Sequence, residues 1–343
     1  PGIDPNRGDD PEEYFNTVLY TGDGGTRNIT GVGFQPDWVW FKSRSAARFH
    51  VWTDSVRGVK KNIYSNSTNA EQEFTGGLTA FNSDGYTIVH DSDLNSINEN
   101  GASIVAWNWK AGGTAVSNTD GTITTTVSAS TEAGFSVFTY TGTGNADSVG
   151  HGLGTTPKLV IFKNRDSSSG WLVLTTAIDG TTDYLSLNLQ NTKTDLDTYS
   201  MTSSVVNFGG ASTSVNKSGD GHVAFAFADI QGYSKFDSYT GNGSASGPFV
   251  YTGFRPAFLM IKRTDVSSDW VMVDTARDPI NDFANFLYPN LSQSEDTDVA
   301  TDYFDALSNG FKLRNTWTAI NASNGAYIYM AFAEQPFKYA NAR

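Results

Sequence analysis

The sequence contains 343 residues, which is enough for about two or three domains with sizeable cores. With 23 Lys and Arg against 36 Asp and Glu, its formal net charge is −13, so it lacks the basic surface that nucleic-acid binding requires. The absence of Cys excludes disulfides, thiolate nucleophiles and Cys-ligated zinc. Aromatic residues at 13%, charged residues at only 17% and 34 Gly indicate a turn-rich, all-β protein.

The first part of the chain predicts a series of short strands. After a polar segment, residues 1–11, that we expect to be flexible, an aromatic strand ends at Tyr20-Thr21-Gly22. A Gly/Pro turn then leads into the apolar run 38–42, which is closed by a Lys and predicts a strand buried on both faces. Residues 51–54 are β-branched and aromatic enough for another strand. Small and large residues alternate over 106–109, so its two Trp side chains should share one core-facing side.

The same series then recurs twice. Between the first two copies lies a Ser/Thr-rich stretch in which residues 122–127 have high β-propensity, so we expect an ordered connector. The matching segments of the second and third copies are 140–142 and 239–241, 159–163 and 258–262, 171–175 and 270–274, and 224–227 and 330–333. A repeat at this spacing predicts one structural unit per copy.

We therefore predict three tandem β-sandwich, jelly-roll-like modules of about 100 residues each, with little helix. The first repeat spans residues 12–113, the second 134–232 and the third 233–343, with the connector at 114–133. Because residues 228–232 leave almost no linker, the second and third repeats should pack closely. No apolar run approaches the roughly 20 residues of a membrane-spanning helix, so we expect no membrane partner.

An acid and a base three residues apart recur at the end of one strand. They are Asp54 and Arg57 in the first repeat and Asp274 and Arg277 in the third, whereas the second has Thr175 and Ile178. Such a pair can bind a saccharide, but it more commonly ties down a loop by an ion pair and hydrogen bonds. We favour the structural interpretation, because the second repeat keeps its strands without the pair.

A second polar pair, five residues apart, recurs in the same way. It consists of Asn66 and Glu71 in the first repeat and Asn290 and Glu295 in the third, with Asn188 and Lys193 in the second. Capping of a turn by Asn explains this pattern without a ligand.

Signals for metal or catalytic sites are weak. The four His residues share no metal-ligand spacing; they are His50, His90, His151 and His222. Asp91, Asp93 and Asn95 have the alternate spacing of a calcium loop, but Ser96 and Ala102 stand where Gly and Glu belong, so a polar hairpin tip explains them better. No nucleophile elbow, phosphate-binding loop or dinucleotide motif is present. We expect no catalytic residue, cofactor or metal site.

Several segments together resemble tandem modules in virion proteins of tailed phages, notably marine ones, often described as tail-fibre-like. The segments are 121–129, 134–137, Gly150-His151-Gly152-Leu153-Gly154 up to Lys158, 54–58, 106–113, Leu307-Ser308-Asn309-Gly310-Phe311-Lys312-Leu313-Arg314 and 329–334. The resemblance covers nearly the whole chain after about Glu12. It implies a protein of the virion surface, on a tail fibre, tail tip or capsid appendage, and transfers no catalytic residue.

Three functions are consistent with these observations. The first is a non-enzymatic virion surface protein for structural display and host adhesion, in which repeated sandwiches gain stability by packing on their neighbours. The second is an array of carbohydrate-binding modules in which exposed Trp or Tyr side chains stack on sugars. The third is a glycan depolymerase with paired carboxylates. We favour the first, on the virion exterior, with other virion proteins and a host-surface glycan as partners and with assembly into a homo-oligomer, a trimer by analogy with phage fibres.

Overall fold

The computed structural model describes residues 10–281, 283–297 and 303–334. The all-β prediction is confirmed, with 44% strand and 3% helix. The helices are single turns, α1 (Asn95–Asn98), α2 (Thr318–Asn321) and the 3-10 helix η2 (Pro11–Glu13). Within these described ranges no helix is long and apolar enough to cross a membrane. Most of the predicted flexible segment 1–11 lies outside the described residues.

The first repeat contains one large and one small sheet. The large sheet has the order β1-β9-β3-β4-β5-β6 and the small sheet the order β2-β8-β7, with antiparallel neighbours throughout. The strands are β1 (Phe15–Thr21), β2 (Thr26–Ile29), β3 (Trp38–Ser43), β4 (Val51–Asp54), β5 (Lys61–Tyr64), β6 (Gln72–Glu73), β7 (Gly77–Asn82), β8 (Gly85–Val89) and β9 (Ser103–Trp109).

The second repeat has the same arrangement with two extra strands. Its large sheet has the order β10-β11-β12-β20-β14-β15-β16-β17 and its small sheet the order β13-β19-β18. The strands are β10 (Val116–Asn118), β11 (Thr125–Ser130), β12 (Phe135–Thr141), β13 (Ser148–Gly150), β14 (Leu159–Asn164), β15 (Leu172–Thr175), β16 (Asp183–Ser186), β17 (Thr194–Asp195), β18 (Ser200–Met201), β19 (Val205–Asn207) and β20 (Gly221–Phe227).

The third repeat again pairs a large and a small sheet. The orders are β21-β29-β23-β24 and β22-β28-β27, and β25 and β26 form a two-stranded ladder joined to β24 by a bridge between Met272 and Leu287. The strands are β21 (Ser234–Thr240), β22 (Phe249–Tyr251), β23 (Pro256–Arg263), β24 (Trp270–Asp274), β25 (Asn285–Phe286), β26 (Asp296–Thr297), β27 (Phe304–Leu307), β28 (Gly310–Leu313) and β29 (Ala326–Ala333).

The stretch 114–133 is less separate than the term connector implies. It supplies β10 and β11, which extend the large sheet of the second repeat along β12. The strand predicted over 122–127 begins only at Thr125, because Ile123 instead forms an isolated parallel bridge with Val149. The Ser/Thr-rich stretch therefore forms an edge of this sheet.

Each large sheet is buried on both faces because alternate residues of a strand enter two different cores. In β3, Trp38 and Trp40 point into a central core, whereas Val39 and Phe41 pack between the large and small sheets of the first repeat. The second and third repeats have corresponding local cores of their own. The predicted common face of the two Trp residues at 106–109 is confirmed, since both belong to the central core.

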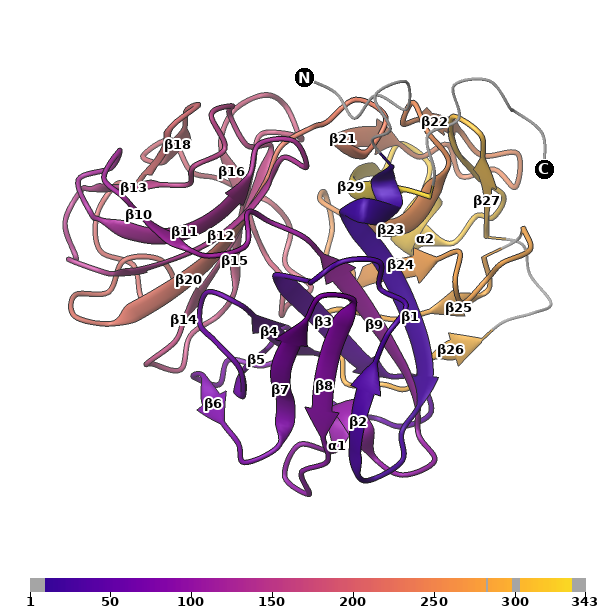
Figure 1. Cartoon of the computed structure of the whole chain (residues 1–343). Coiled ribbons are helices and arrows are strands. Elements are labelled where there is room, and N and C mark those ends of the chain that lie inside the picture. Colours follow the sequence, from indigo (N-terminus) through magenta and orange to yellow (C-terminus); the bar gives the residue numbers. More distant parts are fainter. Residues whose placement is uncertain (1–9, 282, 298–302, 335–343) are drawn as a thin grey trace.

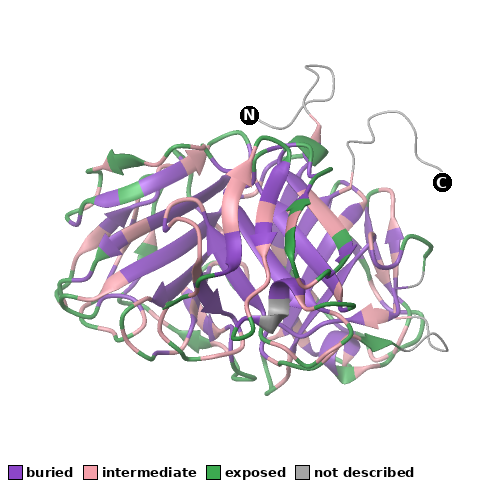
Figure 2. Ribbon diagram, turned by 60° about the horizontal axis from the view of Figure 1, so that its bottom comes forward, coloured by how far each residue is buried: buried purple, intermediate pink, exposed green. Residues whose placement is uncertain are grey.

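The central core is shared by all three repeats. The Trp38 ring lies 5.0 Å from that of Phe225 in the second repeat, and Phe15 lies 5.2 Å from Phe332 in the third. Phe227 and Phe332 join the second and third repeats at 6.2 Å. The repeats thus form three lobes around one centre (Figure 1), with buried strands inside and exposed loops outside (Figure 2). This differs from a row of modules that contact only their neighbours, because every repeat contributes aromatic surface to the same core.

Candidate functional site

Asp54 and Arg57 lie at the end of β4 and are both buried, with Asp54 0% and Arg57 5% exposed. The backbone N–H of Arg57 donates to Asp54 Oδ1 at 2.8 Å, and its Nε donates to Oδ2 at 2.5 Å. Its Nη2 donates to the carbonyl of Trp52 at 3.0 Å. The pair therefore fixes the turn after β4, and neither charged group is open to a saccharide.

Glu71 extends this pair across the seam between the first and second repeats. Its Oε2 accepts from Arg57 Nη1 at 3.0 Å, and its carboxylate forms two bonds with the guanidinium of Arg165, at 3.0 and 2.9 Å. Burial alone would raise the pKa of Glu71, but hydrogen bonds and charge from Arg165 and Arg57 outweigh burial and lower the pKa. The Glu71 N–H also donates to the Arg165 carbonyl at 2.7 Å. Asp54 and Arg57 of one predicted pair and Glu71 of the other therefore form a single cluster.

The third repeat builds the same cluster at its seam with the first repeat. Asp274 accepts from Arg277 Nε at 2.6 Å, Arg277 Nη1 donates to Glu295 at 2.9 Å, and Glu295 binds Arg44 through two bonds of 2.9 and 2.7 Å. Asp274 additionally accepts from Nε1 of Trp107, a first-repeat side chain, at 3.0 Å. Asp274 thus bonds directly to the first repeat. The hydrogen bonds of Asp54, Arg57 and Arg277 stay within their own repeats, and these residues are linked to another repeat through Glu71 or Glu295.

At the seam between the second and third repeats the charges differ. Lys193 occupies the position of Glu71, and Thr264 that of Arg165, so only the backbone bond from Lys193 N to the Thr264 carbonyl, 3.0 Å, remains. The Lys193 side chain instead binds three carboxylates of its own repeat. The second repeat has therefore replaced the Asp–Arg–Glu cluster with a Lys–Asp cluster.

A buried Lys forms a further contact at each seam. The Lys that closes each apolar run donates from Nζ to a carbonyl of the preceding repeat: Lys163 to Thr68 at 3.1 Å, Lys262 to Gln190 at 3.1 Å and Lys42 to Ser292 at 3.2 Å. Because the first repeat binds the third in the same way as the second binds the first, the contacts close a ring. Burial lowers the pKa of Lys163 and Lys262 to about 8 and that of Lys42 to about 7.

The recurring Asn side chains, at residues 66, 188 and 290, fix the starts of β4, β15 and β24. Asn188 Oδ1 accepts from the N–H of Trp171 at 2.9 Å, and Asn290 and Asn66 accept in the same way from Trp270 and His50. The Trp171 indole donates to the Tyr64 carbonyl across the seam at 2.8 Å. These Asn side chains therefore bond to a neighbouring strand start rather than cap their own turn.

Besides the Asn residues at 66, 188 and 290, one further Asn recurs in each repeat, and the sequence analysis did not identify it. Asn98, Asn216 and Asn321 are each 0% exposed, and their Oδ1 atoms accept from the backbone N–H of residues 23, 143 and 242, just after β1, β12 and β21. An aliphatic residue directly before each Asn, Ile97, Val215 and Ile320, is the signal that could have identified them.

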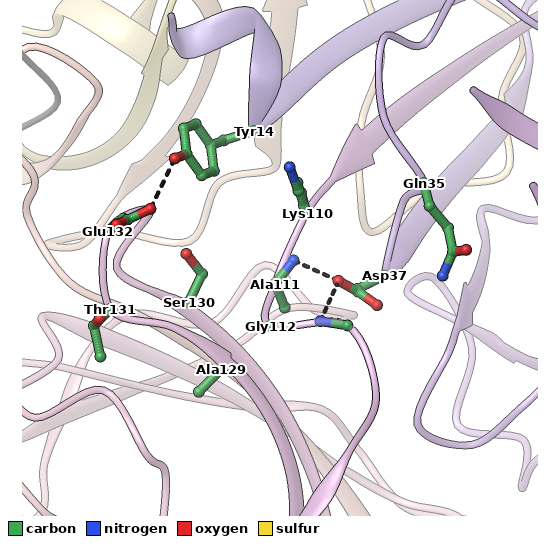
Figure 3. Close-up of a pocket in the computed structure, with 11 residues that line it drawn as sticks. Tyr14, Gln35, Asp37, Lys110, Ala111, Gly112, Ala129, Ser130, Thr131 and Glu132 are labelled. Carbon is green, nitrogen blue, oxygen red and sulfur yellow. Dashed lines mark hydrogen bonds between the residues drawn. The ribbon is translucent and has the colours of Figure 1, made fainter. Parts of the chain in front are cut away.

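The structure contains a cleft of about 420 Å³ where η2 and the end of β9 face the 129–132 turn (Figure 3). Its most buried acid, Asp37, accepts from Ser55 Oγ and from the N–H groups of Ala111 and Gly113 at 2.7–3.1 Å. Burial raises the pKa of Asp37 despite these bonds. At the other wall, Tyr14 donates to Glu132 at 2.9 Å. Asp37 thus secures the 111–113 turn, and Glu132 is bonded to Tyr14.

The aromatic residues considered for sugar stacking are mostly buried. Trp317 is half-buried against the core of the third repeat, and the other seven of the eight Trp side chains are core residues: Trp38, Trp40, Trp52, Trp107, Trp109, Trp171 and Trp270. Two aromatic side chains on β22 are exposed instead, Phe249 by 44% and Tyr251 by 65%. They share one face of an edge strand, with Gly310 of β28 directly opposite Tyr251.

Over residues 10–336 the chain matches the model of a family described as a domain of unknown function (DUF7483). The chain belongs to this family. No curated protein matches the sequence.

The matched range extends from η2 to the end of β29, so the family is defined by the whole arrangement of three repeats and not by one of them. That extent agrees with the shared central core, since no single repeat contains the aromatic side chains that close it.

Proposed function

We propose that this chain is a non-enzymatic component of a phage virion surface that displays a rigid scaffold and adheres to host-surface glycans. The observation that carries the proposal is the use of the repeated polar residues. Asp54, Arg57, Asp274 and Arg277 are buried, and their clusters reach a neighbouring repeat through the Glu71–Arg165 and Glu295–Arg44 ion pairs. The chemistry that the first and third repeats share therefore serves assembly of the scaffold. The acidic composition opposes non-specific binding to DNA and aggregation.

The exposed aromatic pair on β22 supports the adhesive part of the proposal. Phe249 and Tyr251 offer flat apolar surface beside Lys312, which is opposite Phe249 on β28; Asp305 of β27 lies opposite Lys312 on its other side. Aromatic faces flanked by hydrogen-bonding groups suit a sugar, whose rings have apolar C–H faces and polar edges. The corresponding strands β2 and β13 carry no aromatic residue, so the third repeat is the one proposed to bind.

The test combines a binding assay with product sizing. Purified protein is incubated with immobilised host-surface polysaccharide, using Tyr251→Ala as the variant and Val266→Ala, another exposed apolar residue, as the matched control. We expect binding to weaken at least about fivefold in the first variant only, because loss of a stacking ring removes about 1 kcal/mol or more. Equal binding by both variants would reject the β22 surface, and progressive shortening of the glycan would replace the adhesin with a depolymerase.

Location on the virion is tested separately. Immunogold labelling of intact particles should decorate the exterior, and labelling only after disruption of the particles would contradict the proposed display role.

A further inference from the structure

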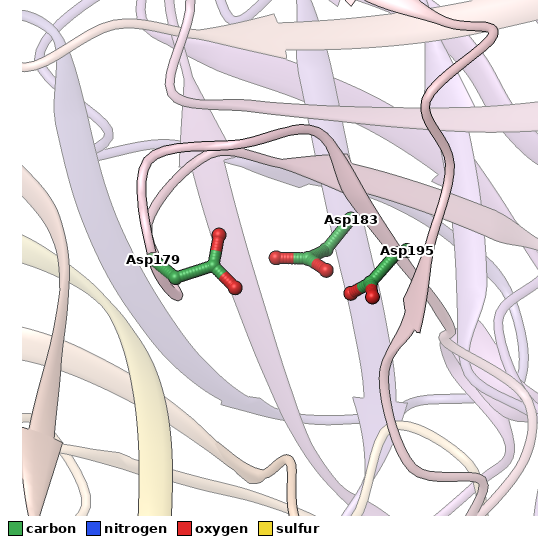
Figure 4. A group of neighbouring side chains, drawn as sticks. All are labelled: Asp179, Asp183 and Asp195. Carbon is green, nitrogen blue, oxygen red and sulfur yellow. The ribbon is translucent and has the colours of Figure 1, made fainter.

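Three carboxyl groups of the second repeat converge beside the seam with the third repeat. Asp179 lies in the turn after β15, Asp183 begins β16, and Asp195 ends β17 directly opposite Asp183. One oxygen of each lies within 4.8 Å of one oxygen of each of the others. Figure 4 shows the carboxyl group of Asp183 between those of Asp179 and Asp195.

The positive charge that these groups share is a single ammonium. Lys193 Nζ lies 2.7 Å from Asp179, 3.1 Å from Asp183 and 2.8 Å from Asp195. Asp183 is fully buried, and its Oδ2 has no hydrogen-bond donor. A buried carboxylate oxygen without a donor is costly, so this atom indicates a missing cationic partner.

The other repeats have no such concentration of negative charge at these positions. In the first repeat the opposed pair is Lys61 and Glu73, and in the third it is Asn285 and Thr297. Like charges directly opposite on neighbouring strands are destabilising, whereas opposite charges and neutral pairs are not. The second repeat therefore concentrates negative charge between the ends of these two strands, with the single ammonium of Lys193 to balance it.

We propose that Asp179, Asp183 and Asp195 form a binding site for a divalent cation, Ca²⁺ in preference to Mg²⁺, and that Lys193 swings aside when the cation binds. Oxygens up to 4.8 Å apart can be bridged by an ion with contacts of about 2.4 Å, which is the Ca²⁺–oxygen distance; Mg²⁺ requires closer, octahedral ligands. Asp179 and Asp195 are exposed, so water completes the shell, and the flexible side chain of Lys193 is 29% exposed and can move outward.

Calorimetric titration of the full chain with CaCl₂ tests the proposal. The wild type should bind one Ca²⁺, and Lys193→Met should bind at least about tenfold more tightly because the competing ammonium is gone. Asp195→Asn, at an exposed position, should weaken binding at least about tenfold because fewer charged ligands remain. Asp237→Asn is the matched control, since it removes one carboxylate from the cluster around Lys235, which has only two.

Three results would overturn the site. They are the absence of binding heat in both the wild type and Lys193→Met, unchanged affinity in Asp195→Asn, and equal weakening by Asp195→Asn and Asp237→Asn. A thermal melt of each variant, with and without Ca²⁺, provides an independent readout, because a bound ion raises the melting temperature only where the site is intact.

Discussion

Replacing Asp54 by Ala would remove the carboxylate that neutralises a buried guanidinium. Arg57 would keep its bonds to the Trp52 carbonyl and to Glu71, but its backbone N–H and Nε would lose their acceptor. Removal of one partner from a buried pair costs about 3–5 kcal/mol, because the remaining charge stays out of water. We therefore expect Asp54→Ala to lower the free energy of unfolding by about this amount.

Asp274→Ala should cost more than Asp54→Ala. Asp274 also accepts from the buried indole N–H of Trp107, and an unsatisfied buried donor adds about 1–3 kcal/mol. The double variant Asp54→Thr/Arg57→Ile carries the residue pair of the second repeat and removes both charges together. It should be less destabilised than Asp54→Ala, because no guanidinium is left without its partner.

Urea unfolding followed by tryptophan fluorescence measures these differences, with Asp93→Ala, at an exposed position, as a control expected to change stability by less than about 0.5 kcal/mol. The reasoning is refuted if Asp54→Ala behaves like the control. It is also refuted if the variant keeps its stability but loses binding to the host-surface glycan, since the pair would then belong to a binding site.

Two further predictions concern buried ionisable groups, Lys163 and His222. Lys163→Met should cost about 1–3 kcal/mol, because the buried Ser169 carbonyl loses the ammonium as donor and the Thr68 carbonyl loses one of its two donors. Burial lowers the pKa of Lys163 from 10.5 to about 8 in the folded state. Between these pH values the unfolded chain binds more protons than the folded chain, so the free energy of unfolding should rise with pH. This rise should be smaller in Lys163→Met, and an unchanged rise would contradict the prediction. Burial likewise lowers the pKa of His222 from 6.5 to about 4. The free energy of unfolding should therefore fall as the pH drops through this window, by up to about 1.4 kcal/mol per pH unit. His222→Gln should remove that contribution, and equal acid sensitivity of the variant in urea unfolding would disprove the prediction.

The strands and their orientation were predictable because hydrophobic periodicity is a local property. The alternation at 106–109 places Trp107 and Trp109 on one face whatever the rest of the chain does. The ring was not predictable in this way, since a strand such as 38–42, apolar on both faces, does not reveal which face meets another repeat. Trp38 contacts Phe225 and Trp107 contacts Asp274 across more than 160 residues of chain.

For the recurring polar residues, too, the local role could be predicted from the sequence and the contacts between repeats could not. Their recurrence identified Asp54, Arg57 and Glu71 as important, and the structural interpretation of the first pair agrees with its burial. Their partner Arg165 could not be predicted, because the link depends on how two repeats meet. The second repeat has Lys193 where the other repeats have Glu, and only the structure explains this difference. Glu71 and Glu295 pair with Arg side chains, whereas Lys193 pairs with three Asp side chains of its own repeat.

The central claim is that three repeats share one core and hold one another in a closed ring. Hydrogen exchange by mass spectrometry across a urea series tests it most directly, by comparing the central strands β9, β20 and β29. If the core is shared, all three strands should lose protection at the same urea concentration in a single cooperative transition. Loss of protection in one repeat while the other two remain protected would contradict the claim.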